Sequence, residues 1–220
     1  AVDALNAYPA RKLYVTNNAS RTPQAVAEQL AGYGLLVAAE DVVTSAQAAA
    51  AHLATLVPAG ARVLVTGGEG LRQAVAENGL RAVEGADDAD AVIQGYSPTL
   101  GWKDLAEASY AVARGIPWVA SNTDMSVPTA RGIAPGNGTF VAAVTSATGV
   151  LPVVTGKPHA PIMQLAARRS AAQRPLVIGD RLDTDIAAAV AAGLDSLLVL
   201  TGVSRWQELM GMDSAALPTR

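Results

Sequence analysis

Short apolar runs alternate with longer alanine-rich stretches along most of the chain. The runs are rich in Val, Ile and Leu, as is typical of strands, and fall at residues 12–16, 62–66, 91–94, 118–121, 152–155, 175–179 and 196–200. Helical stretches separate them, at about residues 22–32, 46–56, 70–78, 102–114, 137–148, 158–169 and 183–192. Strands and helices that alternate in this way predict an α/β fold with parallel strands.

Composition narrows the class of protein. Of the 220 residues, 50% are hydrophobic and 16% are charged, which excludes a disordered chain. The absence of cysteine excludes a disulfide framework, a thiolate nucleophile and Cys-ligated metal, and two histidines are too few for a poly-His metal site. A net charge of −3 and 4% aromatic residues argue against a nucleic-acid partner. No membrane span and no export signal are found, so the expected location is the cytoplasm.

In parallel α/β sheets ligands bind beyond the carboxyl ends of the strands, and this rule selects three stretches. The first is Thr16-Asn17-Asn18, where a hydroxyl and two amides precede a helix. Such groups suit phosphate oxygens, and an ordinary polar turn is the alternative interpretation. The second is Lys157, which lies between a strand and a helix start. Because the chain has only three lysines, a solvated surface position is a less satisfactory explanation for this one.

The third stretch is acidic. A strand delivers Asp180 to the sheet edge, and Asp183 and Asp185 follow within five residues. Hard oxygen ligands of this kind suit magnesium, which takes one or two protein carboxylates together with water and phosphate. Acidic residues in the first turn of a helix explain Asp183 and Asp185 equally well, but they explain Asp180 poorly.

A glycine-rich turn at residues 67–70 follows the strand at 62–66 and resembles the start of a dinucleotide-binding loop. Gln73 stands where that motif needs its third glycine, so a nicotinamide- or flavin-dependent oxidoreductase is disfavoured.

Taken together, residues 16–18, 156–158 and 179–185 resemble the second, third and fourth motifs of the haloacid dehalogenase-like phosphatases. The similarity is to the capped branch that contains p-nitrophenyl phosphatases, phosphoglycolate phosphatase, pyridoxal phosphatase and glycerol-3-phosphate phosphatase. Residues 128–138, just ahead of the lysine motif, also resemble that branch. Features around residues 41–47 and 101–102 favour the glycerol-3-phosphate members.

The resemblance implies a doubly wound, Rossmann-like parallel-sheet core with an inserted α/β cap domain. The core would comprise residues 1–56 and 152–220, and the cap residues 57–151. A substrate must then fit between cap and core. For Ser121-Asn122-Thr123-Asp124, at the end of a cap strand, contact with the leaving group and a plain structural turn are both open interpretations.

The resemblance also assigns roles to individual residues. Thr16, Asn17 and Asn18 would hold the transferring phosphoryl group, and Lys157 would neutralise it and orient the nucleophile. Asp180 would bind Mg²⁺ directly, while Asp185 would support the water shell of the metal. Related capped phosphatases often form homodimers through the cap, so a homodimer is a possible assembly.

One motif of the family is not found. The family's nucleophile lies in a pair of aspartates, one residue apart, followed by Gly-Thr; this belongs on a strand expected before residue 1. Asp87, Asp88 and Asp90 lack the Gly-Thr and fall within the predicted cap. The expected function is Mg²⁺-dependent hydrolysis of small phosphomonoesters, such as glycerol 3-phosphate, 2-phosphoglycolate or p-nitrophenyl phosphate, through an aspartyl-phosphate. The alternative is a non-catalytic protein that binds a phosphate-bearing ligand.

Overall fold

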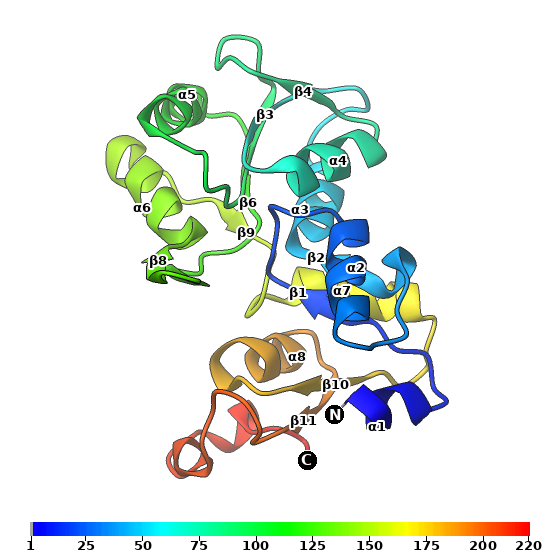
Figure 1. The fold of residues 1–220 in the computed structure, drawn as a ribbon. Coiled ribbons are helices and arrows are strands. Elements are labelled where there is room, and N and C mark those ends of the chain that lie inside the picture. The colour runs from blue at the N-terminus through cyan, green and yellow to red at the C-terminus, as the bar shows by residue number, and fades with distance from the viewer. Residues whose placement is uncertain (1) are drawn as a thin grey trace.

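The computed structural model describes residues 2–220 and has the mixed α/β architecture expected from the sequence (Figure 1). The largest sheet has five strands, all parallel, in the order β4-β3-β5-β6-β9. Its strands are β3 (Arg62–Thr66), β4 (Arg81–Val83), β5 (Ala91–Gln94), β6 (Trp118–Ala120) and β9 (Val153–Val154). Four of these five were expected from apolar runs; β4 was not, because its side chains are mostly exposed and its sequence is short and mixed.

Alternation along the strands explains the layers on this sheet. In β3, Val63 and Val65 face one side and Leu64 faces the other, as the two-residue period of a strand requires. The first side packs against α3 (Ser45–Leu53) and α4 (Glu69–Glu77). The second side packs against α5 (Trp102–Ala113) and α6 (Asn137–Thr148). The sheet is therefore buried on both faces, which is why its strands read as continuous apolar runs.

The remaining strands form three small sheets. Strands β1 (Tyr14–Thr16) and β2 (Val42–Thr44) pair in parallel, as do β10 (Leu176–Gly179) and β11 (Asp195–Leu198). Among residues 2–220, these two pairs are separate sheets, whereas the sequence predicted a single core sheet. Strands β7 (Ser126–Thr129) and β8 (Gly132–Pro135) make an antiparallel hairpin that the sequence analysis missed.

The other helices surround the small sheets. They are α1 (Val2–Ala7), α2 (Pro23–Gly32), α7 (Ala160–Ser170) and α8 (Ala187–Ala191). Helix α2 begins where expected, because the Thr22 hydroxyl accepts a hydrogen bond from the Ala25 N–H and Pro23 occupies the first turn. Short 3₁₀ turns lie at Ala39–Asp41, Trp206–Leu209 and Ser214–Ala216.

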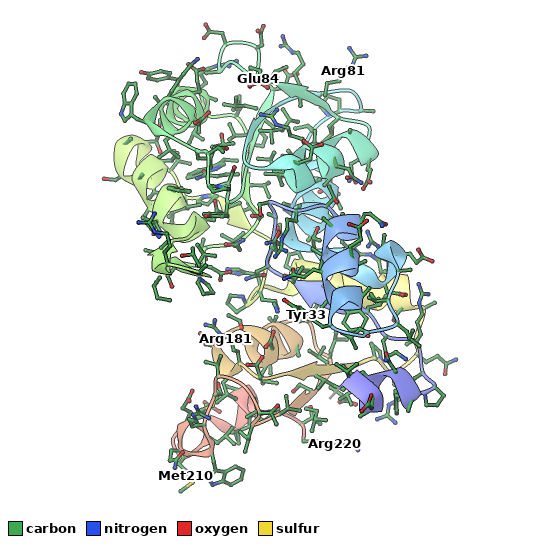
Figure 2. All side chains as sticks on the ribbon, in the orientation of Figure 1. Tyr33, Arg81, Glu84, Arg181, Met210 and Arg220 are labelled. Atoms are coloured by element: carbon green, nitrogen blue, oxygen red, sulfur yellow. The ribbon has the colours of Figure 1, made fainter. Side chains whose placement is uncertain are left out.

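Residues outside the predicted cap, at 57–151, also contact its five-stranded sheet, and the cap limits themselves stay a prediction. Strand β9 pairs with β6, so residues 153–154 belong by hydrogen bonding to the five-stranded sheet and lie beyond the predicted limit at 151. Helix α3, placed in the core by the sequence, shares one buried apolar cluster with β3 and β5. The five-stranded sheet therefore takes one strand from the segment after residue 151 and packs against a helix from the segment before residue 57. Figure 2 places Glu84 at one end of the molecule and Met210 at the other, with Arg181 between them.

Candidate phosphate site

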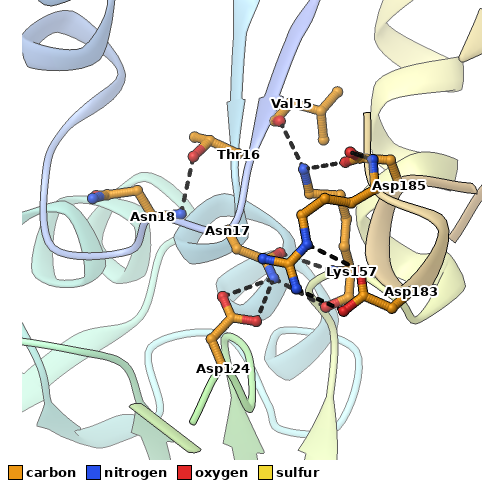
Figure 3. Close-up of polar contacts among 9 residues, drawn as sticks. Val15, Thr16, Asn17, Asn18, Asp124, Lys157, Asp183 and Asp185 are labelled. Atoms are coloured by element: carbon orange, nitrogen blue, oxygen red, sulfur yellow. Dashed lines mark hydrogen bonds and ion pairs between the residues drawn. The ribbon is translucent and has the colours of Figure 1, made fainter. Parts of the chain in front are cut away.

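Residues from the core and from the cap region meet where β1, β9 and β10 end (Figure 3). The loop after β1 turns sharply, because the Thr16 hydroxyl accepts a hydrogen bond from the Asn18 N–H at 3.1 Å. The Asn18 side chain then accepts from the Arg21 N–H at 3.0 Å. These local bonds fix the shape of the loop, and the predicted phosphate-binding role of Thr16 and Asn18 stays a prediction.

Asn17 has a different environment from its two neighbours. Its Oδ1 accepts from the Lys157 N–H at 2.8 Å, and its Nδ2 donates to the Lys157 carbonyl at 3.0 Å. Nδ2 also donates to both carboxylate oxygens of Asp124, at 3.2 and 3.1 Å. The amide of Asn17 is thus engaged by protein groups, and its predicted direct contact with a phosphoryl group stays a prediction.

Lys157 occupies the centre of the site. Its Nζ lies 2.7 Å from Asp185 Oδ1 and donates to the Val15 carbonyl at 3.3 Å. The two charged side chains are 15% and 12% exposed, so this ion pair is largely shielded from water. Gly156 precedes the lysine because a Cβ there would overlap the Ser121 carbonyl and approach Asn17 Oδ1. The ammonium therefore links the end of β1 to the acidic segment after β10.

The acidic segment begins at the end of β10 and continues into a π-helical turn, Leu182–Ile186. The Arg181 carbonyl accepts from the Ile186 N–H at 3.1 Å, which is the wider hydrogen bond of such a turn. Turns of this kind often occur at functional sites. Gly179 lets Asp185 approach the strand, since a Cβ at that position would overlap the aspartate side chain.

The three aspartates have separate partners. Asp180 Oδ2 accepts from the Val203 N–H at 2.9 Å, and Asp185 Oδ2 accepts from the Arg181 N–H at 3.2 Å. Asp183 forms an ion pair with Arg181 at 2.6 Å. Hydrogen bonds from that guanidinium hold the pKa of Asp183 below its usual value. Among residues 2–220, no group of three or more acidic or histidine side chains could hold a metal ion by itself.

Asp180 nevertheless fits a metal centre that is completed by other ligands. It directly follows strand β10, its side chain lies against Gly202 and Val203, and its Oδ1 receives no hydrogen bond from the described residues. Magnesium commonly takes one or two protein carboxylates and fills its remaining positions with water and phosphate oxygens. The donor set on this chain is consistent with that pattern.

Asp124 and Arg181 are members of the site that the sequence analysis did not assign. Burial raises the pKa of Asp124, and the hydrogen bond from Asn17 together with the charges of Arg181 and Lys157 opposes that rise. The sequence placed Asp124 at the end of a strand but could not distinguish a leaving-group contact from a turn. The hydrogen-bond partner of its carboxylate, Asn17, lies 107 residues away in the sequence, and local patterns carry no signal for this contact.

The glycine-rich turn at residues 67–70 serves packing. A Cβ at Gly68 would lie 2.8 Å from the Ser20 carbonyl, and one at Gly70 would overlap the Arg21 carbonyl. Gly70 N–H also donates to the Ser20 carbonyl at 3.2 Å. These glycines let the start of α4 lie against the segment that follows the Thr16 loop. Asp90, one of the three aspartates that precede β5, forms an ion pair with Arg62 at 3.0 Å and so has a structural partner.

Comparison with known proteins identifies the family. Residues 1–81 match the family model of haloacid dehalogenase-like hydrolases, and residues 154–219 match a model described as HAD-hydrolase-like. A 5'-nucleotidase of Bacillus subtilis is 40% identical over 199 residues, which cover 90% of this chain and 77% of that protein. The chain belongs to the haloacid dehalogenase-like hydrolases.

Other relatives of this haloacid dehalogenase-like hydrolase share the fold closely. The D-glycerol 3-phosphate phosphatase of Mycobacterium tuberculosis is 50% identical over all 220 residues, which span 62% of its length. A crystal structure of the glycerol phosphate phosphatase from that organism in complex with magnesium superposes with a TM-score of 0.96, covering 99% of this chain and 67% of that one. A p-nitrophenyl phosphatase structure from Geobacillus stearothermophilus, 35% identical, gives a TM-score of 0.90 and covers 99% and 85% of the two chains.

These comparisons confirm the expected family and fold class. As for the membrane, the helices that the structure describes are all too short or too polar to span a bilayer.

Proposed function

We propose that the protein carrying this chain is a Mg²⁺-dependent phosphomonoesterase for small metabolites that works through an aspartyl-phosphate. The observation that carries the proposal is the shielded ammonium of Lys157, held between the Val15 carbonyl and Asp185 beside the Thr16 loop. A fixed positive charge in a site with little water stabilises the charge of a transferring phosphoryl group. Relatives named for glycerol 3-phosphate and p-nitrophenyl phosphate support the same class of substrate.

The open edges of the core sheets suggest where the nucleophile belongs. Within the described residues, β1 pairs only with β2 and β10 only with β11. A parallel strand between β1 and β10 would satisfy backbone groups on both edges. We place the nucleophilic and acid–base carboxylates of the family on such a strand, where they would meet the ammonium of Lys157. Asp87, Asp88 and Asp90 are poorly placed for this role, because they precede the amino end of β5, whereas Lys157 follows the carboxyl end of β9 in the same parallel sheet.

Asp180 would hold the metal directly, and Asp185 would orient its water ligands. Bound Mg²⁺ would supply charge neutralisation for the phosphoryl oxygens. Lys157 would share that task and hold the nucleophilic carboxylate in its ionised form. Thr16 and Asn18 would orient the phosphoryl group through the loop after β1.

The decisive experiment measures phosphate release from glycerol 3-phosphate, 2-phosphoglycolate and p-nitrophenyl phosphate by the protein expressed from its full reading frame. Lys157→Ala should lower kcat/KM by about 10²–10³-fold, the usual cost of losing one preorganised charge in an active site. Lys12→Ala and Lys103→Ala are the matched controls and should stay near the wild-type rate. Circular dichroism checks that each variant is folded.

The same experiment separates the two functional hypotheses. A wild-type protein that binds inorganic phosphate in calorimetry but releases none from any ester would be a non-catalytic binding protein. A loss of less than threefold for Lys157→Ala in an active enzyme would remove Lys157 from the mechanism.

We also propose that the cap mediates a homodimer. Large apolar side chains are exposed on this part of the chain, including Trp102 at 79% and Ile133 at 76% exposure. The proposal extends the family resemblance, in which capped phosphatases often form homodimers through the cap, and a dimer contact would remove the apolar area of such side chains from water. Sedimentation equilibrium of the wild type and of Trp102→Glu tests it, and a monomeric wild type would contradict it.

A further inference from the structure

Asp124 is held more rigidly than a residue in an ordinary turn. Its N–H donates to Asn122 Oδ1 at 3.1 Å, and its carbonyl accepts from the Gly138 N–H at 2.8 Å. A Cβ at Gly136 would overlap the Asp124 carbonyl, and one at Gly138 would overlap that of Thr123. The start of α6 therefore packs so closely against this loop that only glycine fits at these two positions. The backbone of Asp124 is fixed before any substrate arrives.

The carboxylate of Asp124 and the backbone of Lys157 together determine which way the Asn17 amide points. An ionised carboxylate only accepts hydrogen bonds, so it selects the Nδ2 group of Asn17, which lies 3.2 and 3.1 Å from its two oxygens. The oxygen of the amide must then face the opposite side. There it accepts from the Lys157 N–H at 2.8 Å.

Asn17 in turn holds the backbone of Lys157 from two sides. It accepts from the N–H and donates to the carbonyl of that residue, at 2.8 and 3.0 Å. Its own carbonyl is held by Asn122 Nδ2 at 2.8 Å and by the Ser45 hydroxyl at 2.6 Å. A continuous chain of hydrogen bonds therefore runs from Asp124 through Asn17 to the lysine (Figure 3).

We propose that Asp124 is a positioning residue that fixes the ammonium of Lys157 by orienting the Asn17 amide. The loop after β6, which carries Asp124, would thereby fix the position of the Lys157 ammonium, which follows β9. The effect on turnover rests on the proposed function, whereas the effect on the lysine does not.

The first test measures the position of the lysine without any enzymatic assay. The three lysines allow competitive acetylation, with mass spectrometry reporting Lys157 against Lys12 and Lys103 as internal references. Asp124→Ala should raise the acetylation rate of Lys157 at least about threefold, because Asn17 Nδ2 loses its carboxylate partner and holds the Lys157 backbone less firmly. Asp124→Leu, which keeps the volume without an acceptor, should behave in the same way if the alanine variant folds poorly.

Conservative replacement provides the specific readout. Asp124→Asn retains an oxygen that can accept from Asn17 Nδ2, so its Lys157 should react at close to the wild-type rate. Asp104→Ala removes another cap aspartate that accepts a backbone N–H, that of Gly101 at 2.8 Å, and should leave all three lysines unchanged. Wild-type reactivity of Lys157 in Asp124→Ala and Asp124→Leu would overturn the proposal.

Kinetics then connects position to turnover. We expect Asp124→Ala to lose about tenfold in kcat, or about 1.4 kcal/mol, with KM within about twofold, and Asp124→Asn to recover most of that loss. An equal loss in Asp124→Asn and Asp124→Ala would show that the carboxylate acts directly on substrate, and would overturn the positioning role. If the wild type releases no phosphate, the proposed function fails and the acetylation result still decides this inference.

Discussion

The Lys157–Asp185 ion pair is the strongest electrostatic contact of the site at the scale of single residues. Both side chains are less than one-sixth exposed, and their atoms are 2.7 Å apart. Removing one partner of a buried pair leaves the other charge without compensation, whereas removing both does not. The pair therefore ties the function of Lys157 to the stability of the fold.

A double-mutant cycle should reveal this coupling. Lys157→Met should lower the free energy of unfolding by about 3 kcal/mol, because Asp185 is left buried and charged. Adding Asp185→Asn to that variant should recover at least about 1 kcal/mol. Urea denaturation measures both values, and strictly additive losses would mean that water already solvates the pair.

Two aspartates of the cap region have pKa values shifted in opposite directions. Hydrogen bonds from Arg62 lower the pKa of Asp90, while burial raises the pKa of Asp124. The lowered pKa stabilises the fold above the ordinary value for Asp, and this contribution is lost as the pH falls through the folded value. The raised pKa of Asp124 has the opposite effect on the pH dependence of folding stability. Stability is lost as the pH rises from the ordinary Asp pKa through the higher pKa of the folded protein.

Replacement by asparagine should separate these two signs. Asp90→Asn should lower Tm near pH 7 and should lower it less at about pH 3.5, because the ordinary pKa of Asp lies near that pH and part of the contribution is already lost. Asp124→Asn should shift Tm upward, relative to wild type, on going from about pH 3.5 to pH 7. Thermal melts at the two pH values give the comparison. Parallel pH trends for the two variants would contradict the assignment.

At the scale of elements, glycines determine how closely helices approach loops. The first turn of α4 lies against Ser20 and Arg21, and no side chain fits at Gly70. This contact joins the cap region to the segment after the Thr16 loop. The same device brings the start of α6 against the loop that carries Asp124.

Gly70→Ala tests this contact. The added Cβ would overlap the Arg21 carbonyl, and a backbone group cannot move aside as a flexible side chain can. We expect a loss of about 1–3 kcal/mol in unfolding free energy, measured in urea. Gly85→Ala, which meets nothing within 4 Å, is the control and should change stability by less than about 0.5 kcal/mol. Equal stabilities of the two variants would show that α4 is free to shift.

At the scale of the whole molecule, the cap region and the core are joined more firmly on one side than on the other. On the α3 side, a shared buried cluster connects Leu53 to β3 and β5. On the other side the chain passes through Val150 and Leu151, which are 39% and 77% exposed, before β9. Limited proteolysis should therefore begin at the connection that contains Val150 and Leu151.

Limited proteolysis with thermolysin provides the measurement, because this protease cuts before large apolar residues. The first cleavage should fall before Val150 or Leu151, where the backbone is exposed and no helix or strand protects it. The region around Leu53 should resist cleavage, since that side chain is fully buried. Early fragments that end within the five-stranded sheet would contradict this picture of the connections.

The sequence by itself determined most of the helices and strands, and the three ends of strands where function was expected. Apolar runs fix strands such as β3 and β5 because both faces of their sheet are buried, and Thr22 and Pro23 fix the start of α2 through local bonds. The positions of Thr16, Lys157 and Asp185 followed from strand ends and from the family's motifs. These signals lie within short segments of the chain, so they can be recognised without knowledge of the fold.

Only the tertiary structure decided which of these groups touch. Asn17 was expected to hold phosphate, and it proves to be joined to Asp124 and Lys157, at sequence separations of 107 and 140 residues. The sequence could not predict strand β4 or the pairing of β9 with the five-stranded sheet. Both depend on the strands they pair with, β3 and β6, more than on the β propensity of their own residues. Hydrogen bonds between distant residues depend on how the layers are placed against one another, and hydrophobic periodicity shows which face of an element is buried but not which polar groups then meet.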